Sequence, residues 1–502
     1  MKKNDQVQII FGLKLRQLRN AKGFSLLDLS KKSGISLSYI NEIEKGKKYP
    51  KSDKILALAE ALSIPYDQLV SLKVNKALAP AMQAINSDLI SQFPLGLFGI
   101  EANKLIEMIA AAPAKVNSFI TTLIEIARSY QLTSEQFYFR ALRAYQELHM
   151  NYFEELEMAV VSFVKQSGLT RTKLTQSAIL IQILEEKFHY QVISDESFKD
   201  KGLSEFRSLT IPGKQTLYYL NPTLKESQKC FQITRELGYS VLALKDRPHT
   251  STIVRVKSFE EALNNFKASY FANALLMPYD EIVADLNKWF AHKNWNEEFL
   301  IKLIEKYKVS AETFLYRLCT VIPHEFGINN LFFLRFYNTK MKFSYELDKE
   351  LHLGQMHSPH ASGLGKHYCR RWAAIRSLAE LTKQREKKRG IVTKPLIHVQ
   401  RSKYMDSDFE YLLISIARPH QIDENLNSSI TIGFLVNKDL PEKIKFAEDP
   451  AIIRSDVNHI CETCSLSNCK DRAAKPYDLE ESIRKKKQED TLEAFFKSLS
   501  RN

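Results

Sequence analysis

The chain has 502 residues, more than one hydrophobic core usually serves, so we expect three or four domains. Its 44% hydrophobic and 26% charged residues are ordinary for a soluble protein, and no uncharged apolar run approaches the roughly 18 residues of a membrane span. The start of the chain mixes charged and apolar positions like an amphipathic helix and unlike a signal peptide, so we expect a cytoplasmic protein. The net charge of +14 favours a polyanionic partner, although excess lysine can also be a solvated surface.

The first 72 residues predict a helix-turn-helix domain of five helices. A first helix ends at Gly23, a second begins at Ser25 and ends at Gly34, and a third begins at Ser36 and ends at Gly46. Two short capped helices joined by a glycine-containing turn are the signature of this motif. Residues 1–72 carry 13 Lys and Arg against 7 Asp and Glu, a surplus of +6. The alternative is a small helical protein-interaction domain.

The segments LRNAKGFSLLDLSKKSGISLSYINEIEKGKKYP and SDKILALAEALSI resemble the lambda-repressor-like (XRE) helix-turn-helix domains. The resemblance implies that the third helix enters the major groove of double-stranded operator DNA. It implies a core of Leu29, Ile35, Ile40, Ile43, Leu56 and Leu62. Base edges would be contacted by Leu37, Ser38, Asn41 and Glu42, and phosphates by Ser25, Tyr39, Lys45, Lys47 and Lys48. Such domains usually bind pseudo-palindromic sites, so we expect a homodimer or a higher homo-oligomer.

Residues 75–165 predict a helical connector that also serves dimerisation. Apolar residues recur at three-to-four spacing over 104–132 and over 134–168, which is typical of long helices. Pro113 predicts a break in the first of them.

Residues 166–345 predict an α+β domain with strands at SLTI and QTLYYL and a helix from about residue 224. The sequence RELGY stands where a zinc peptidase of the IrrE type shows HELGH, and Arg235 and Tyr239 replace the two histidines. Arginine has no lone pair for zinc, so only Glu236 remains of the catalytic trio. We therefore expect no enzyme activity; the alternative is an IrrE-type metallopeptidase fused to a DNA-binding domain.

A second resemblance runs from about residue 166 to residue 475. FEEALNNFKASYFANALLMPYDEI, VSAETFLYRLCTV and NLFFLRFYNTKMKFS are similar to the short-chain fatty acyl transcriptional regulators, and KHYCRRWAAI and ICETCSLSNCKDRAAKP follow in that family's order. The resemblance implies a regulator of carbon or fatty-acid metabolism with a degenerate IrrE-like sensor domain (166–345) and a cysteine-containing domain (346–475). It also implies a short-chain acyl-CoA effector.

Three of the six cysteines crowd into the C-terminal domain. Cys461, Cys464 and Cys469 form a CxxCxxxxC run, and Cys369 is a candidate fourth thiolate. Four thiolates suit a structural zinc or a [4Fe-4S] cluster, and the spacing does not decide between them. We favour the cluster, because a sensor benefits from a redox-labile centre; three free cysteines near a turn are the alternative. Cys230 and Cys319 are expected in the core.

An acyl-CoA would need cationic groups for its phosphates, and we select Arg371 and Arg418. Residues 476–502 predict a charged helical tail. The expected fold class is mainly α with a smaller α+β part. One further alternative is a regulator that responds only to redox state or iron, with a vestigial acyl pocket.

Overall fold

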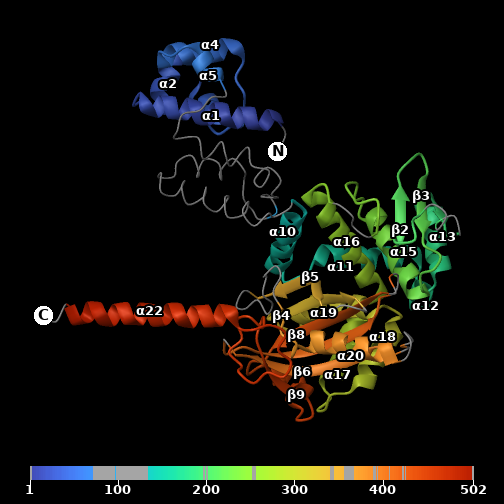
Figure 1. Ribbon diagram of the computed structural model, residues 1–502. Helices are drawn as coiled ribbons and strands as arrows, with labels where there is room; N and C mark the ends of the chain where they lie inside the picture. Colours follow the sequence, from blue (N-terminus) through green and yellow to red (C-terminus); the bar gives the residue numbers. More distant parts are fainter. Residues whose placement is uncertain are drawn as a thin grey trace. The chain divides into compact units, whose positions relative to one another are not determined.

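The computed structural model describes residues 3–71, 134–195, 202–251, 256–339, 344–354, 367–387, 394–405, 407–420 and 425–499, with single positions at Leu97, Phe198, Val392 and Asp423. The chain forms two compact units (Figure 1). The first comprises Met1–Tyr145 and Arg255–Leu263, and the second comprises Gln146–Val254 and Asn264–Asn502. None of the helices in the described ranges has the length and apolar character of a membrane span.

The first unit contains the five predicted N-terminal helices. They are α1 (Lys3–Ala21), α2 (Leu26–Ser33), α3 (Leu37–Glu44), α4 (Ser52–Leu62) and α5 (Tyr66–Val70). Ser25 caps α2 through a reciprocal pair of hydrogen bonds with Asp28, and Gly34 ends it with a φ of 69°. The hydroxyl of Ser36 makes no such bond at the start of α3.

One apolar cluster holds these helices together. It comprises Phe11, Leu15, Leu29, Ile35, Ile40, Ile43, Ile55, Leu58, Ala59, Leu62 and Leu69. The prediction that Leu56 belongs to this core is wrong, because its side chain is 50% exposed. The helix α4 buries positions 55, 58, 59 and 62, one helical stripe, and Leu56 points away from it. Gly12 lets α1 approach α3 closely, because a Cβ there would lie 2.2 Å from the carbonyl oxygen of Ile43.

The predicted helix over 104–132, with its break at Pro113, lies outside the described residues. The chain from 134 to 168 forms two helices, α10 (Ser134–Leu148) and α11 (Glu154–Ser167). Met150 and Asn151, both with positive φ, separate them. The second compact unit begins at Gln146, so α11 lies within it.

The helix α11 is held inside the second unit by a buried ion pair. Arg317 is 1% exposed and donates two hydrogen bonds to Glu157 of α11, at 2.5 and 3.0 Å. The hydroxyl of Tyr270 donates to the same carboxylate at 2.7 Å. A segment predicted as connector thus contributes a charged group to the interior of the second unit.

The next part of the second unit is helical with a small sheet. Its elements are α12 (Arg171–Leu174), α13 (Ser177–Phe188), β1 (Tyr190–Ile193), β2 (Ser208–Ile211), β3 (Thr216–Leu220), α15 (Glu226–Val241), α16 (Phe259–Leu276), α17 (Tyr279–Phe290), α18 (Glu297–Tyr307) and α19 (Ala311–Phe326). The sheet has the order β1-β3-β2, with β1 parallel and β2 antiparallel to β3. The predicted strands at SLTI and QTLYYL and the following helix are therefore present as β2, β3 and α15.

The last part is built on a six-stranded sheet of order β5-β4-β8-β7-β6-β9. Its elements are β4 (Leu331–Thr339), β5 (Tyr345–Leu353), α20 (Ala373–Lys387), β6 (Leu396–Tyr404), β7 (Glu410–Pro419), β8 (Leu426–Leu435), α21 (Leu440–Lys443), η2 (Lys445–Glu448) and β9 (Ile453–Val457). Trp372 and α20 pack on one face against Phe332, Leu334 and Phe336 of β4. The strand β4 precedes the predicted boundary at residue 345, yet it pairs with β8 of the C-terminal part.

The chain then continues into a single long helix, α22 (Tyr477–Leu499), which extends from the sheet in Figure 1. Its described side chains from Glu481 to Phe496 are all exposed. Helical N-terminal and connecting segments, followed by mixed α+β parts, confirm the predicted fold class.

Candidate functional site

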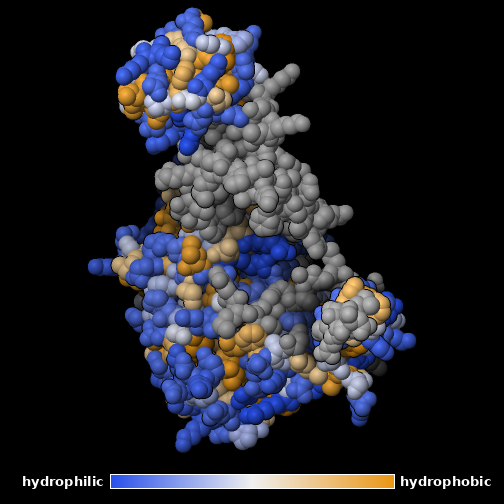
Figure 2. Space-filling model, turned by 90° about the vertical axis from the view of Figure 1, so that its left-hand side faces the viewer, coloured by the Kyte–Doolittle hydropathy of each residue, from blue (hydrophilic) through white to orange (hydrophobic). Residues whose placement is uncertain are grey.

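The helix α3 presents one exposed face and one buried face. Ile40, Ile43 and Glu44 are buried, whereas Leu37 and Ser38 at its first turn are exposed. Asn41 and Glu42 follow one turn later on the same side and are half-buried. These are the four residues predicted to contact base edges, and they form one stripe. Hydrophilic and hydrophobic residues both appear on the surface of the helix-turn-helix domain in Figure 2, and the 43% exposed Leu37 is one of the hydrophobic ones.

A buried ion pair fixes α3 to α1. Arg19 donates to both carboxylate oxygens of Glu44, at 2.6 and 2.9 Å, and to the carbonyl oxygen of Phe24 at 2.7 Å. This hydrogen-bonded carboxylate raises the pKa of Arg19 above its usual value. Such a bidentate contact is geometrically specific, so it holds the exposed stripe of α3 in a defined orientation.

The predicted phosphate contacts surround this stripe. Lys45, Lys47 and Lys48 are exposed just after α3. Lys48 forms an exposed ion pair with Glu42 at 2.8 Å, which raises the pKa of Lys48. The ring of Tyr39 lies under the ammonium group of Lys54 at 4.3 Å.

Ser25 differs from these lysines, because its hydroxyl is already engaged. It donates to the Asp28 carboxylate at 2.6 Å and accepts from the Asp28 backbone N–H at 3.1 Å. A phosphate contact by this hydroxyl would therefore replace a capping hydrogen bond.

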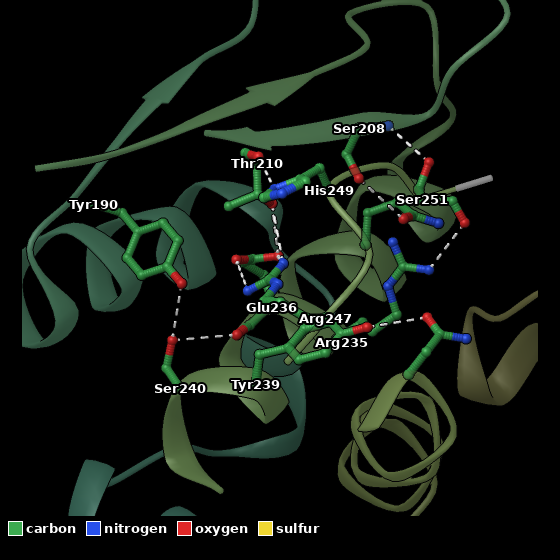
Figure 3. Close-up of polar contacts among 12 residues, drawn as sticks. Tyr190, Ser208, Thr210, Arg235, Glu236, Tyr239, Ser240, Arg247, His249 and Ser251 are labelled. Atoms are coloured by element: carbon green, nitrogen blue, oxygen red, sulfur yellow. Dashed lines mark hydrogen bonds and ion pairs between the residues drawn. The ribbon is translucent and has the colours of Figure 1, made fainter. Parts of the chain in front are cut away.

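The helix α15 carries the degenerate peptidase motif, and its glutamate is occupied by an arginine (Figure 3). Glu236 is 1% exposed, and Arg247 donates to its two carboxylate oxygens at 2.6 and 2.5 Å. Thr210 of β2 donates to the same carboxylate at 3.2 Å, and the Arg247 guanidinium lies 3.8 Å from the ring centre of Tyr239. A carboxylate held in this way has no free oxygen with which to activate water.

The two residues that replace the histidines have structural contacts of their own. Arg235 donates to the backbone carbonyl of Ser251 at 3.2 Å, and Tyr239 donates to Asn265 at 3.1 Å (Figure 3). Across the described part of the chain, no three His, Cys, Asp or Glu side chains are arranged to hold a metal ion. The geometry of this site therefore disfavours hydrolysis by a bound zinc.

The four selected cysteines line one cavity of the C-terminal part. Cys369 precedes α20, whereas Cys461, Cys464 and Cys469 follow β9, and all four belong to the same lining. An antiparallel bridge between Tyr368 and Ile460 brings the two segments together. The backbone N–H of Cys369 donates to His459 at 3.2 Å, and that of Cys461 donates to His367 at 2.8 Å.

Backbone and arginine contacts order the loop that carries the three cysteines. Arg472 donates to the carbonyl oxygens of Cys461 and Cys464 at 3.1 and 3.3 Å and to that of Leu466. The backbone N–H of Ala473 donates to the Cys461 sulfur at 3.4 Å, a contact that also suits a thiolate ligand. Burial raises the pKa of Cys369 to about 11. The thiols share a cavity but are not drawn into a ligand sphere, as the absence of any such group among the described residues shows.

The remaining predicted residues fall in different places. Cys230 and Cys319 are buried at 2% and 0% exposure, as expected for core residues. Arg371 lines the cysteine cavity. Arg418 lies at the end of β7, where Arg207 and Arg335 influence its pKa, and it does not line that cavity. The structure thus does not bring the two selected arginines into one site. Sequence reasoning missed Arg247, for which the spacing gave no signal.

Comparisons with known proteins identify two domains. Residues 15–69 match the family model described as Helix-turn-helix, and residues 181–319 match the one described as IrrE N-terminal-like domain. The chain is 23% identical over 352 residues to the HTH-type transcriptional regulator PrpR of Mycobacterium tuberculosis, an alignment that covers 64% of this chain and 65% of PrpR. It is 44% identical over 61 residues to the HTH-type transcriptional repressor RghR of Bacillus subtilis, covering 12% of this chain and 45% of RghR.

Among solved structures, one described as a Mycobacterium tuberculosis transcriptional regulator matches 67% of this chain and 93% of that chain, with a TM-score of 0.47 and 17% identity. The family matches show that the N-terminal unit contains a helix-turn-helix domain and that α13 to α19 correspond to an IrrE-like domain.

Proposed function

We propose that this protein is a transcription regulator that binds operator DNA sequence-specifically through α3 and has no peptidase activity. The observation that carries the proposal is the exposed stripe of Leu37, Ser38 and Asn41 on a helix that the Arg19–Glu44 pair fixes from behind. Residues near the start of an inserted helix reach base edges, and lysines beside it neutralise phosphates. PrpR and RghR, both described as transcriptional regulators, support this proposal.

The test is selection of genomic DNA by the purified full chain. Fragments of the source genome are retained by the protein at moderate salt, eluted and sequenced. We expect enrichment of a few fragments that share a pseudo-palindromic motif with half-sites about one helical turn apart, because two subunits of a homodimer would contact them. Uniform retention of all fragments, or none, would contradict sequence-specific regulation.

We further propose that the second unit senses a small ligand. The support is the sequence resemblance to the short-chain fatty acyl regulators, together with a peptidase-like helix whose glutamate is neutralised by Arg247. A short-chain acyl-CoA is the proposed effector, and Arg371 and Arg418 remain the proposed contacts. Such an effector regulates DNA binding only if its affinity differs between two states of the protein.

The four cysteines of the cavity are the proposed ligands of a [4Fe-4S] cluster, with structural zinc as the alternative. The donor set fits either group: four thiols from two distant segments line one cavity, and Arg371 and Arg472 would compensate a negatively charged centre. A bound cluster would add redox sensitivity, whereas zinc would only stabilise the loop.

Cys464→Ser is expected to lose most of the metal that the wild-type protein retains after anaerobic purification, because one of four ligands is removed. The measurement is iron, sulfide and zinc analysis of both proteins. Cys319→Ala is the matched control, since this cysteine is buried in the core and should leave the metal content unchanged. Matching iron and sulfide indicates a cluster, and zinc alone indicates the structural alternative. Wild-type protein without any of these would refute the metal site.

A further inference from the structure

A second group of charged residues lies on the sheet face opposite α20. Phe332, Leu334 and Phe336 of β4 face α20, so the alternate positions Arg335 and Tyr337 face the other way. The register places Lys349 of β5 opposite Arg335, and Ser428 of β8 opposite both Tyr337 and Arg418 of β7. Arg335, Tyr337, Lys349 and Arg418 therefore share this face.

Two further elements complete the group. Glu312, in the first turn of α19, accepts hydrogen bonds from Arg335 at 2.7 Å and from Lys349 at 3.4 Å. Arg335 also pairs with Asp348. Arg207 reaches the group from the residue before β2, since its charge acts on Arg335, Tyr337 and Arg418. Arg335 and Glu312 are 18% and 19% exposed, so solvent reaches the group.

The charges in this group do not balance. Arg207, Arg335, Lys349 and Arg418 supply four positive charges, whereas Glu312 and Asp348 supply two negative ones. Both carboxylates are paired with Arg335 and Lys349. Within the described residues, the guanidinium groups of Arg207 and Arg418 have no hydrogen-bonded or ion-paired partner, and the Nε of Arg207 is buried without an acceptor.

These two arginines are electrostatically unfavourable as they stand. Burial and neighbouring arginines lower the pKa of both. His420 lies just beyond β7, and burial together with Arg207 and Arg335 lowers its pKa as well. Its Nδ1 accepts a hydrogen bond from the backbone N–H of Asp423 at 3.0 Å, so its Nε2 carries the proton and can donate. Two half-buried guanidinium groups and a neutral imidazole donor thus await an acceptor.

We propose that Arg207, Arg418 and His420 bind the phosphate monoester of a small ligand. A phosphate monoester carries nearly two negative charges at neutral pH, which matches the surplus of two positive charges in the group. Guanidinium groups suit phosphate oxygens because they donate in parallel pairs. The source is either free phosphate or the 3′-phosphate of coenzyme A, and in the second case the inference rests on the proposed acyl-CoA effector.

The test combines thermal unfolding with ligand titration of the full chain. Inorganic phosphate is expected to raise the wild-type melting temperature above that in chloride at equal ionic strength. Arg207→Gln and Arg418→Gln are each expected to weaken phosphate binding about tenfold or more, the loss of one charge-assisted hydrogen bond. In chloride both variants should melt at or above the wild-type temperature, because they relieve repulsion. Arg454→Gln, an exposed position on β9, is the control and should change neither value.

Titration with coenzyme A and dephospho-coenzyme A separates the two sources. Tighter binding of coenzyme A, lost in Arg418→Gln, identifies its 3′-phosphate as the ligand; equal binding of both, with stabilisation by phosphate retained, identifies free phosphate. The inference is overturned if phosphate stabilises no more than chloride, or if the arginine variants lower the melting temperature equally in both salts. If acetyl-CoA binds wild type and Arg418→Gln equally well, the effector proposal survives and this site fails.

Discussion

Arg247→Met is expected to lower the free energy of unfolding of the second unit by about 3–5 kcal/mol, the usual cost of removing one partner of a buried ion pair. The substitution leaves the Glu236 carboxylate, 1% exposed, with only the Thr210 hydroxyl as a donor. It also removes the guanidinium from the ring of Tyr239. The measurement is urea unfolding followed by the fluorescence of Trp289 and Trp295, both in the second unit.

The double variant Glu236→Gln/Arg247→Met distinguishes a structural pair from a masked catalytic site. A neutral amide needs no counter-ion, so the double variant should recover most of the stability lost by Arg247→Met. Arg484→Met on the exposed helix α22 is the control and should leave stability unchanged. If Arg247→Met were as stable as the wild type and gained peptidase activity with added zinc, Arg247 would be an inhibitory plug and the non-enzymatic account would be wrong.

Glu157→Ala is the second substitution with a large expected effect, again about 3–5 kcal/mol of unfolding free energy. It leaves Arg317, 1% exposed, with the Met277 carbonyl at 3.3 Å as its remaining partner, and it removes the acceptor of the Tyr270 hydroxyl. Since α11 is joined to α19 through this carboxylate, the loss should reduce the cooperativity of unfolding as well as the midpoint.

Glu155→Ala tests whether this effect belongs to the ion pair. Glu155 is exposed in the first turn of α11, so its removal changes helix charge without disturbing the interior. We expect a change within about 0.5 kcal/mol, as for other surface substitutions. Similar losses for Glu155→Ala and Glu157→Ala would mean that α11 acts as a solvated connector, which is how the sequence alone describes it.

The elements with strong local signals could be predicted from sequence. Capping residues and glycines define α2, and the period of two defines β2 and β3. The prediction for Leu56 failed because it was carried over from the resemblance, whereas the buried stripe of α4 follows the phase set by its start at Ser52. The two helices α10 and α11 were not separated, because the apolar spacing continues across the positive-φ residues Met150 and Asn151.

The candidate sites show the same division. The CxxCxxxxC run announces itself, and the structure adds the bridge that brings Cys369 to it. The partner of Glu236 could not be predicted, because Arg247 lies eleven positions away in a loop and only the tertiary fold turns it toward α15. The unpaired Arg207 and Arg418 come from separate segments and meet only across the assembled sheet.

The most direct measurement of the central claim is the affinity of wild type and Asn41→Ala for an enriched genomic fragment and for unrelated DNA of equal length. We predict that Asn41→Ala binds the enriched fragment about 10- to 100-fold more weakly, the loss of one base contact, and binds unrelated DNA as wild type does. Asn20→Ala, exposed at the end of α1, should behave like wild type on both. Unchanged affinity of Asn41→Ala for the enriched fragment, or an equal loss on both DNAs, would contradict sequence readout by α3.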